Sequence, residues 1–412
     1  MKVAVFSPMP PERSGIADYS ALLLPALQAR CEVVAVKRGA RRPPRGTDVS
    51  VYHIGNNPEA HGWIVDALRR TPGVVVLHDF VLHHLVSGIT LARGDSKAYL
   101  DALERDGGLV ARLLGYAVME KRIPPLWENR PEDFPLAGEV LGLATGLIVH
   151  SRYVRDRARA AGYAGPVWIV PHPAFPVPAL EPLGVDGDPV FAAFGNVNAS
   201  KRAPQLLDAY ARVRPGRPAS TLLLVGATSP GFDLDRRLQR LGLDGAGLLR
   251  EGYVAEDRLW QLMAAADVHV NLRSPTMGET SGTAIRALAL GKPLVVSDVG
   301  WFSELPDEVA LKVPVDAHEG DTLAAALDLL ASRPDGRRAM GEAARDLARR
   351  EHDLDRVADL YVSAFEQAAG GGAVSDDVLG DVSRAAAEVG IEPGSAAAHE
   401  IAARLGEVEL GG

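Results

Sequence analysis

The 412-residue sequence contains a single cysteine, Cys31, so it cannot form an internal disulfide and it offers no thiolate metal site. No apolar run approaches the roughly 18 residues that a membrane-spanning helix needs. Residues 2–7 are strand-like and lack the basic region, apolar stretch and small-residue cleavage site of an export signal. We therefore expect a soluble protein of a reducing compartment, the cytoplasm.

Positive charge is also scarce, because 44 Lys and Arg residues face 53 Asp and Glu residues, which gives a formal net charge of −9. This balance argues against a general nucleic-acid-binding surface, which needs clustered cations. One local cluster holds five cations within nine residues and no acid: Lys37, Arg38, Arg41, Arg42 and Arg45. We interpret it first as a solvated loop; the alternatives are weak peripheral contact with anionic lipid at the inner face of the membrane, or binding of an anionic acceptor.

The chain is long enough for two domains, at about 100–200 residues per domain. The first half alternates helix-compatible segments with six short strands, expected at 3–7, 32–36, 49–54, 74–77, 147–150 and 167–170. Fully apolar runs such as 74–77 indicate strands that are buried on both faces, as in a parallel sheet covered by helices. The alternation of strand and helix predicts a doubly wound α/β domain.

The same pattern starts again after a proline-rich stretch at 171–182, which we interpret as the domain linker. Strands are expected at 190–194, 221–225, 248–254, 268–272, 294–296 and 309–313. Three glycines at 370–372 end a later amphipathic helix. We predict an N-terminal domain at 1–175, a C-terminal domain at 186–350, a helix at 351–369 that packs back toward the N-terminal domain, and a Gly-hinged helical tail at 370–412.

The loops after the strands are the candidate sites, because open α/β sheets bind ligands at the carboxyl ends of their strands. The loop after the first strand lacks the G-x-G-x-x-G spacing that a dinucleotide pyrophosphate needs, which weakens the case for a nicotinamide or flavin enzyme. Gly15, near the start of the next helix, lets an anion approach backbone amides closely. A purely structural turn is the more common role of such a Pro-Pro segment.

The loop after residue 194 places Lys201 and Arg202 ahead of a helix expected at about 204–213. Two cations in a first helical turn oppose the positive end of the helix dipole, so a structural role explains them poorly. A phosphate group would offset this cost, because backbone amides and both cations would converge on it. We expect ligand binding here, with a solvated pair as the alternative.

The loop after residue 272 leads into a further helix through Glu279, Ser281, Gly282 and Thr283. Ser, Gly and Thr at a helix N-terminus expose hydrogen-bond donors without bulky side chains, which suits a diphosphate. Glu279 has two interpretations: it caps the helix N-terminus, or it binds a ligand hydroxyl.

Histidines follow the fourth strand at 78, 83 and 84. We interpret His78 as a polar group at the strand end and His83 and His84 as helix surface. The spacing does not fit a zinc site, and the triplet from Asp233 to Asp235 is attributed to chance in a chain with 53 acids. We therefore expect no metal site.

Taken in order, these segments resemble glycosyltransferases of the GT-B fold, specifically the retaining group called glycosyltransferase family 4. The resemblance covers about residues 1–368. Its most specific part is 275–282 with 286–298, which is similar to the family's donor-site helix. Weaker matches lie at 14–16, 76–79 and 171–173, and at Gly195 with Lys201. The resemblance implies an α/β protein of GT-B fold: two tandem doubly wound, Rossmann-like parallel-sheet domains facing a central cleft, with a short helical C-terminal appendage.

By this resemblance the N-terminal domain holds the acceptor and the C-terminal domain holds the nucleotide sugar. The implied activity is hexosyl transfer from a nucleotide-diphosphate sugar to a hydroxyl of a glycan, lipid-linked or small-molecule acceptor, with retention and without a protein nucleophile. Bacterial polysaccharide or glycoconjugate biosynthesis is the implied setting, and no cofactor or metal is required. The implied catalytic residues are His78, Lys201, Arg202 and Glu279. The implied substrate-binding residues are Gly15, Asp79, Asn196, Tyr253, Ser281, Gly282, Thr283 and Arg286.

Three positions depart from the family pattern. Asn196 stands where many members have a phosphate-binding arginine, and Arg202 stands where a small residue is usual, so we expect Arg202 to supply the missing charge. Arg286 stands in place of the second glutamate of the family signature, which holds the ribose hydroxyls. This departure points to a different geometry of nucleotide recognition or to a non-standard sugar donor.

Two other functions fit the same architecture. One is a nucleotide-sugar epimerase or hydrolase, which would give an altered or free sugar instead of a new glycoside. The other is a catalytically inactive scaffold that binds the nucleotide sugar without consuming it, which the change at Arg286 motivates.

Overall fold

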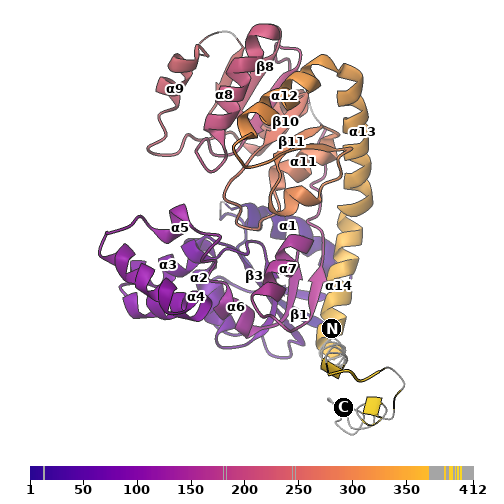
Figure 1. Ribbon diagram of the computed structural model, residues 1–412. Coiled ribbons are helices and arrows are strands. Elements are labelled where there is room, and N and C mark those ends of the chain that lie inside the picture. Colours follow the sequence, from indigo (N-terminus) through magenta and orange to yellow (C-terminus); the bar gives the residue numbers. More distant parts are fainter. Residues whose placement is uncertain are drawn as a thin grey trace. The chain divides into compact units, whose positions relative to one another are not determined.

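The structure is a computed structural model that describes residues 1–370, apart from 13, 180, 182, 244 and 246, together with 385–386, 389–392, 395, 397–398 and 400. The chain divides into two compact units (Figure 1). Unit 1 contains Met1–Val149, Arg155–Val170 and the described residues from Ala358 onward, and unit 2 contains His150–Val154 and Pro171–Val357. The sequence places the domain boundary at residue 175, whereas the contacts place it at Pro171.

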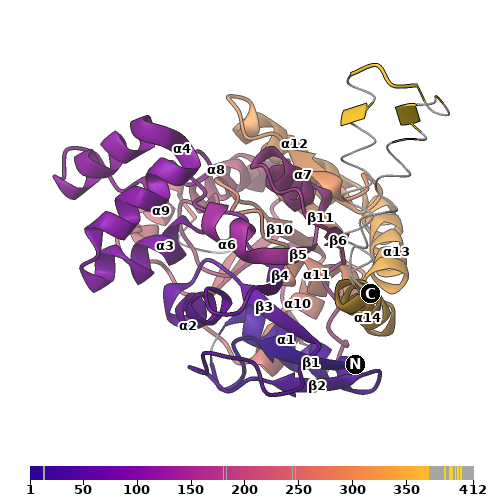
Figure 2. The same ribbon diagram turned by 90° about the horizontal axis from the view of Figure 1, so that it is seen from below.

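Unit 1 is built on a six-stranded sheet with the order β2-β1-β3-β4-β5-β6, in which every strand pair is parallel. Its strands are β1 (Lys2–Phe6), β2 (Glu32–Ala35), β3 (Val49–Ile54), β4 (Gly73–Leu77), β5 (Ala144–Val149) and β6 (Val167–Ile169). The helices along this part of the chain are α1 (Gly15–Gln28), α2 (Pro58–Leu68), α3 (His83–Ile89), α4 (Ser96–Met119), α5 (Leu126–Asn129), α6 (Gly138–Leu143) and α7 (Arg152–Ala160) (Figure 2). All five residues of β4 are buried, as its apolar sequence predicts.

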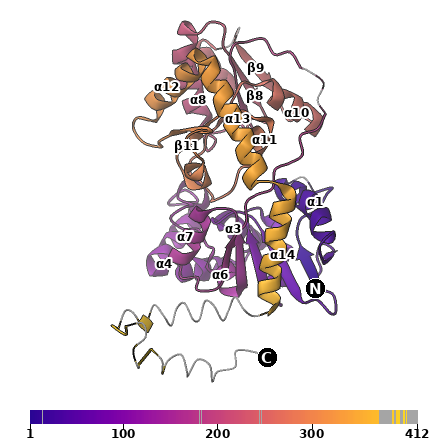
Figure 3. The same cartoon turned by 90° about the vertical axis from the view of Figure 1, so that its right-hand side faces the viewer.

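The last described helix, α14 (Leu354–Gly370), reaches unit 1 from Ala358 onward (Figure 3). The hydroxyl of its residue Tyr361 lies 2.6 Å from the hydroxyl of Tyr19 on α1, in a fully buried contact. Arg30 also pairs with Asp359 at 2.6 Å. These contacts attach the helix predicted at 351–369 to α1 and the residues after it in unit 1.

Unit 2 repeats the architecture with a parallel six-stranded sheet in the order β12-β11-β10-β7-β8-β9. Its strands are β7 (Val190–Phe194), β8 (Thr221–Val225), β9 (Leu248–Glu251), β10 (Val268–Asn271), β11 (Leu294–Ser297) and β12 (Ala310–Val313). Its helices are α8 (Ala203–Val213), α9 (Leu234–Leu241), α10 (Glu256–Ala265), α11 (Gly282–Leu290), α12 (Glu319–Ser332) and α13 (Pro334–Glu351). The two doubly wound sheets predicted from the sequence are confirmed.

Two predictions of local structure are wrong, and a third concerns residues that the structure largely does not describe. The strand expected at 248–254 ends at Glu251, so Tyr253 belongs to the following loop. His83 is fully buried rather than on the helix surface, because its ring bonds to the hydroxyl of Tyr99 at 2.8 Å and to the carbonyl of Phe134 at 2.7 Å. The tail predicted at 370–412 lies largely outside the described residues. Among those residues, every helix is too short or too polar to span a bilayer.

Candidate functional site

The first loop of the site follows β7 and lies tightly against the end of β8. The backbone N–H of Gly195 donates to the carbonyl of Val225 at 2.9 Å. Gly226 has a φ of 145°, and a Cβ on it would lie 2.1 Å from the Gly195 carbonyl oxygen. Only glycine fits such an approach. The loop is thereby fixed at the carboxyl edge of the sheet, with Asn196 exposed on it.

Asn198 shapes the turn that presents Lys201. Its side-chain oxygen accepts hydrogen bonds from the backbone N–H of Lys201 and from the hydroxyl of Ser200, both at 2.9 Å. Its amide nitrogen donates to the hydroxyl of Ser229 at 3.1 Å. Sequence analysis did not single out Asn198, although Asn is a common turn residue because its side chain bonds to the backbone two or three residues further on. The turn holds Lys201 half-buried, just ahead of α8.

Arg202 has a partner that the sequence did not reveal. Its guanidinium forms a two-contact ion pair with Glu319 at the start of α12, one contact being Nε to Oε1 at 2.8 Å. The Glu319 side chain is only 5% exposed. This buried carboxylate, rather than a ligand, offsets the cation at the N-terminus of α8. The pair joins α8 to α12, and the predicted role of Arg202 in binding phosphate stays a prediction.

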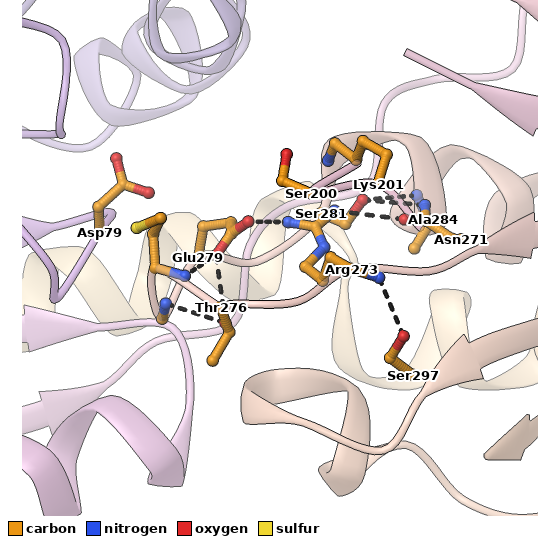
Figure 4. Close-up of polar contacts among 12 residues, drawn as sticks. Asp79, Ser200, Lys201, Asn271, Arg273, Thr276, Glu279, Ser281, Ala284 and Ser297 are labelled. Carbon is orange, nitrogen blue, oxygen red and sulfur yellow. Dashed lines mark hydrogen bonds and ion pairs between the residues drawn. The ribbon is translucent and has the colours of Figure 1, made fainter. Parts of the chain in front are cut away.

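The second loop of the site follows β10, and Glu279 is its central carboxylate (Figure 4). One Glu279 oxygen pairs with Nη1 of Arg273. The other accepts from the backbone N–H of Met277 at 2.8 Å and from the hydroxyl of Thr276 at 3.3 Å. The backbone N–H of Ser274 donates to the Ser200 carbonyl at 2.9 Å, which joins this loop to the Lys201 loop.

The charge state of Glu279 follows from its two cationic neighbours. Burial raises the pKa of Glu279. The charges of Arg273 and Lys201, together with backbone N–H groups, lower it by more, so the pKa of Glu279 lies below its ordinary value. Glu279 is therefore ionised at neutral pH. Its negative charge lies near the positive charge of Lys201.

Arg273 is the residue of this loop that the sequence analysis passed over. It is 4% exposed, and its backbone N–H donates to the hydroxyl of Ser297 at 2.9 Å. Its Nη2 donates to the side-chain oxygen of Asn271 at 3.2 Å, and its guanidinium carbon lies 4.8 Å from the centre of the Phe302 ring. Within the described part of the chain its Nε atom has no hydrogen-bond partner. The sequence did offer one sign that Arg273 belongs to the site, because it is a charged residue directly after the apolar strand expected at 268–272.

The N-terminus of α11 is capped by Ser281, whose hydroxyl accepts from the backbone N–H of Ala284 at 3.4 Å. Glu279 therefore does not cap this helix, which removes one of its two interpretations. The side-chain amide of Asn271 donates to the hydroxyls of Ser281 at 3.0 Å and Thr283 at 2.8 Å. The first helical residues are Gly282 and Thr283, positions at which an α-helix leaves its N–H groups without intrahelical acceptors. Asn271 thus orients this helix end.

Arg286, one turn further along α11, packs against aromatic rings. Its guanidinium carbon lies 3.7 Å from the ring centre of Phe175 in the linker and 5.6 Å from that of Trp260 on α10. It also pairs with Glu256 at 3.5 Å. These contacts give Arg286 a packing role, and its predicted role in substrate binding stays a prediction.

A pocket of about 440 Å³ lies beside the first loop, at the carboxyl ends of β8 and β9. Its lining residues are Val197, Leu224, Gly226, Ala227, Thr228, Leu234, Arg250, Glu251 and Gly252. Arg250 at its edge pairs with Asp235 at 2.5 Å. Tyr253 follows the last lining residue and is 77% exposed, so its ring is accessible to a ligand.

The candidate residues of unit 1 lie at the start of α1 and at the end of β4. Gly15 is the first residue of α1 and is exposed. His78 is 8% exposed and follows β4 directly. Asp79 accepts from the backbone N–H of Asn56 at 2.8 Å, which ties the β4 loop to the β3 loop. The structure thus gives Asp79 a structural contact, and its predicted contact with substrate stays a prediction.

The residues described here contain no group of three or more His, Cys, Asp or Glu side chains that could hold a metal ion. In the triplet discounted above, Asp233 caps α9 by accepting from the backbone N–H of Arg236 at 3.1 Å. The independence from metals and cofactors implied by the resemblance stays a prediction.

Comparison with known proteins gives one family match and several structural relatives. Residues 188–332, all within unit 2, match the family model "Glycosyl transferases group 1". Over 201 residues the chain is 29% identical to a D-inositol 3-phosphate glycosyltransferase of Saccharomonospora viridis, and the match covers 45% of this chain and 46% of the relative. The match thus spans about half the length of that relative.

Several solved structures resemble nearly the whole chain. Sucrose-phosphate synthase of Thermosynechococcus elongatus has a TM-score of 0.63 at 18% identity, with 89% of this chain and 98% of that chain covered. The Anabaena protein HepE in complex with UDP has a TM-score of 0.55 at 14% identity, with 89% and 100% covered. These likenesses confirm the predicted GT-B fold.

Proposed function

We propose that this chain is a retaining glycosyltransferase that moves a sugar from a nucleoside-diphosphate sugar to a hydroxyl acceptor. The observation that carries the proposal is the grouping of Lys201, the N-terminus of α11 and the ionised Glu279 at one edge of the unit 2 sheet. The family match at 188–332 covers this edge. The S. viridis relative is named as a glycosyltransferase, and HepE was solved with UDP.

In this proposal the diphosphate lies between Lys201 and the first amides of α11, those of Gly282 and Thr283. A helix N-terminus is a general anion site because its N–H groups and dipole point at the ligand. Lys201 adds a full positive charge, and Arg202 is left out because Glu319 already neutralises it. These groups would stabilise the diphosphate as it departs, an electrostatic contribution that is fixed before the reaction begins.

The nucleoside is assigned to the 440 Å³ pocket at the ends of β8 and β9. The pocket shares Val197 with the loop that carries Lys201, so a ligand there adjoins the proposed diphosphate position. Gly252 leaves room for a flat base, since a Cβ on it would meet nothing within 4 Å, and exposed Tyr253 offers a ring for stacking. Sites of a few hundred cubic ångströms suit small ligands of this kind.

Glu279 is assigned to a sugar hydroxyl rather than to nucleophilic attack. Both of its oxygens already accept hydrogen bonds, from Arg273 on one side and from Met277 and Thr276 on the other. A carboxylate held in this way has acceptor capacity left for a hydroxyl and little freedom to move. In the proposed step the bond from the anomeric carbon to the diphosphate oxygen breaks. The acceptor oxygen bonds to the same face of that carbon, and its proton passes to the leaving diphosphate.

The resemblance assigns the acceptor to unit 1 and gives His78 the task of orienting the sugar, and we retain both assignments as part of the proposal. The acceptor's identity, and any contact of the basic loop at 37–45 with lipid, are left to experiment. Arg38 in that loop pairs with Glu12 and donates to the Glu59 carbonyl at 2.7 Å.

The test is turnover with a panel of UDP-, GDP-, ADP-, dTDP- and CDP-sugars and a broad set of acceptors. We expect one sugar donor to yield free nucleoside diphosphate and a new glycoside whose anomeric configuration, read by NMR, matches that of the sugar donor. An inverted glycoside would refute retention. A free or epimerised sugar with no glycoside would refute transfer, and binding without consumption would favour the inactive scaffold.

The matched control for the site is a second lysine of the same unit. Lys312 on β12 pairs with Asp307 at 2.8 Å and lies outside the two loops. We expect Lys201→Ala to lower turnover by about 10²–10³, the usual effect of removing one such group, and Lys312→Ala to leave it unchanged. Equal behaviour of the two variants would refute the diphosphate assignment.

A further inference from the structure

Unit 1 contains a buried pair of histidines at the carboxyl end of its sheet. Nδ1 of His53 lies 3.0 Å from Nε2 of His78, and the two ring centres are 5.2 Å apart with an angle of 27° between the planes. His53 is 3% exposed and His78 is 8% exposed. A direct hydrogen bond therefore joins two imidazoles largely out of contact with water.

The parallel register of β3 and β4 brings the two side chains to the same face of the sheet. His53 is the partner of Val76, and His78 lies two residues beyond Val76. Side chains two residues apart point to the same face of a strand, so His78 follows on the His53 side. The backbone N–H of His78 continues the pairing by donating to the Ile54 carbonyl at 2.9 Å.

Further contacts fix both rings. The ring of Tyr19 meets His78 edge-on, with centres 4.9 Å apart, and lies 5.9 Å from His53. The Tyr19 hydroxyl is held in turn by Tyr361 at 2.6 Å. His61 on α2 bonds through Nδ1 to the His53 carbonyl at 3.0 Å. Burial lowers the pKa of His61 to about 4, so His61 is neutral and donates to that carbonyl.

When both imidazoles are neutral, the hydrogen bond between them contains one proton, and this proton couples their tautomers. If His53 donates from Nδ1, the proton of His78 must be on its own Nδ1. If His78 donates from Nε2, its Nδ1 is an acceptor. The partner of one ring nitrogen thus decides what the other nitrogen offers to a ligand.

We propose that His53 is a positioning residue that fixes the ring orientation and the tautomer of His78. The effect on turnover rests on the proposed function, in which His78 orients the sugar. The effect on the tautomer does not depend on it. Residues that orient a metal-bound histidine change affinity or activity by about 10–100-fold when removed, and we expect an effect of the same order here.

The two amide residues separate this role from a general structural one. In His53→Asn the amide lies near the position of Nδ1 and keeps a partner for His78. In His53→Gln it lies near the position of Nε2 and no longer reaches the Nε2 atom of His78. Both variants replace a buried ring by a polar side chain, so a purely structural role predicts similar behaviour.

The first readout is ¹⁵N NMR of the His78 ring nitrogens in the full chain without ligand, at neutral pH. We expect a single tautomer in the wild type and in His53→Asn, and a mixture in His53→Gln. A mixture in the wild type, or the same single tautomer in His53→Gln, overturns the proposal. His83→Phe, which removes a buried histidine bonded to Tyr99 and Phe134, is the control and leaves His78 unchanged.

The second readout is steady-state turnover of the nucleotide sugar. We expect His53→Gln to lower kcat by about 10–100-fold with an unchanged KM, and His53→Asn to recover most of it. If kcat is unchanged in His53→Gln while His78→Asn loses most of its turnover, the claim that His53 affects turnover through His78 is overturned. Full turnover in His78→Asn, or none in the wild type, refutes the proposed function instead, and the NMR result still decides the role of His53.

Discussion

Replacing Arg273 by methionine would remove the cation that compensates the partly buried charge of Glu279. Arg273 is 4% exposed, and the Glu279 side chain is 25% exposed. Removing one partner of a buried ion pair typically costs about 3–5 kcal/mol, because the other charge is left uncompensated. Lys201 also lowers the pKa of Glu279 and remains in place, so we expect the lower end of this range, about 3 kcal/mol.

The pH dependence gives this prediction a sign. In the wild type the pKa of Glu279 lies below its ordinary value of 4.5, so the carboxylate contributes stability above that pH and loses it as the pH falls through the lowered pKa. In Arg273→Met, burial acts against Lys201 alone, and we expect the pKa of Glu279 to rise. A protonated Glu279 needs no cation, so the stability difference between wild type and variant should shrink from about pH 7 toward about pH 4.

The assay is urea unfolding followed by far-UV circular dichroism for Arg273→Met, Glu279→Gln and the double variant. Because the chain has two units, the transition that shifts in all three variants is the one compared. The double variant removes both charges, and we expect it to cost less than the sum of the single variants by about 1–3 kcal/mol. A cost below about 1 kcal/mol for Arg273→Met, or a difference independent of pH, would refute the compensation.

Three further predictions follow from the same structure. Lys201→Ala should lower kcat/KM by about 10²–10³ without lowering the melting temperature, and an equal loss of stability would mean that Lys201 supports the fold instead. Gly226→Ala should destabilise unit 2 by at least about 2 kcal/mol in urea unfolding, because its Cβ would lie 2.1 Å from the Gly195 carbonyl. Burial lowers the pKa of His61 and His269 to about 4 in the folded protein. As the pH falls from about 6.5 to about 4, each histidine should therefore reduce the free energy of unfolding by about 1.4 kcal/mol per pH unit. Glutamine at either position should flatten that slope, and an unchanged slope would contradict the assignment.

The fold could be predicted from the sequence because its signals are local. Buried parallel strands are continuous apolar runs, and all twelve expected strands are present. The errors occurred where local pattern and packing diverge. The strand expected at 248–254 was too long, because the sequence of residues 252–254 does not show where β9 stops pairing with β8. In the structure β9 ends at Glu251. His83 was assigned to the surface because no sequence pattern reveals its bonds to Tyr99 and Phe134.

The candidate site could be predicted only as a set of loops. Lys201 and Glu279 follow strands, and their chemistry is visible in the sequence. The pairing of Arg202 with Glu319 joins residues 117 positions apart, so no local pattern reveals it. The same holds for the His53–His78 bond, which depends on the register of two strands. Arg273 was visible but undervalued, because only the structure shows that it is buried against a carboxylate.

The central claim is that unit 2 binds a nucleoside diphosphate through Lys201 and the N-terminus of α11. The most direct test is thermal stabilisation of wild type and Lys201→Ala by UDP, GDP, ADP, dTDP and CDP. A ligand at 100 times its dissociation constant adds about 2.7 kcal/mol of stability. We predict that one nucleotide stabilises the wild type clearly and Lys201→Ala far less at the same concentration. Stabilisation by none of the five, or equal stabilisation of both proteins, would contradict the account.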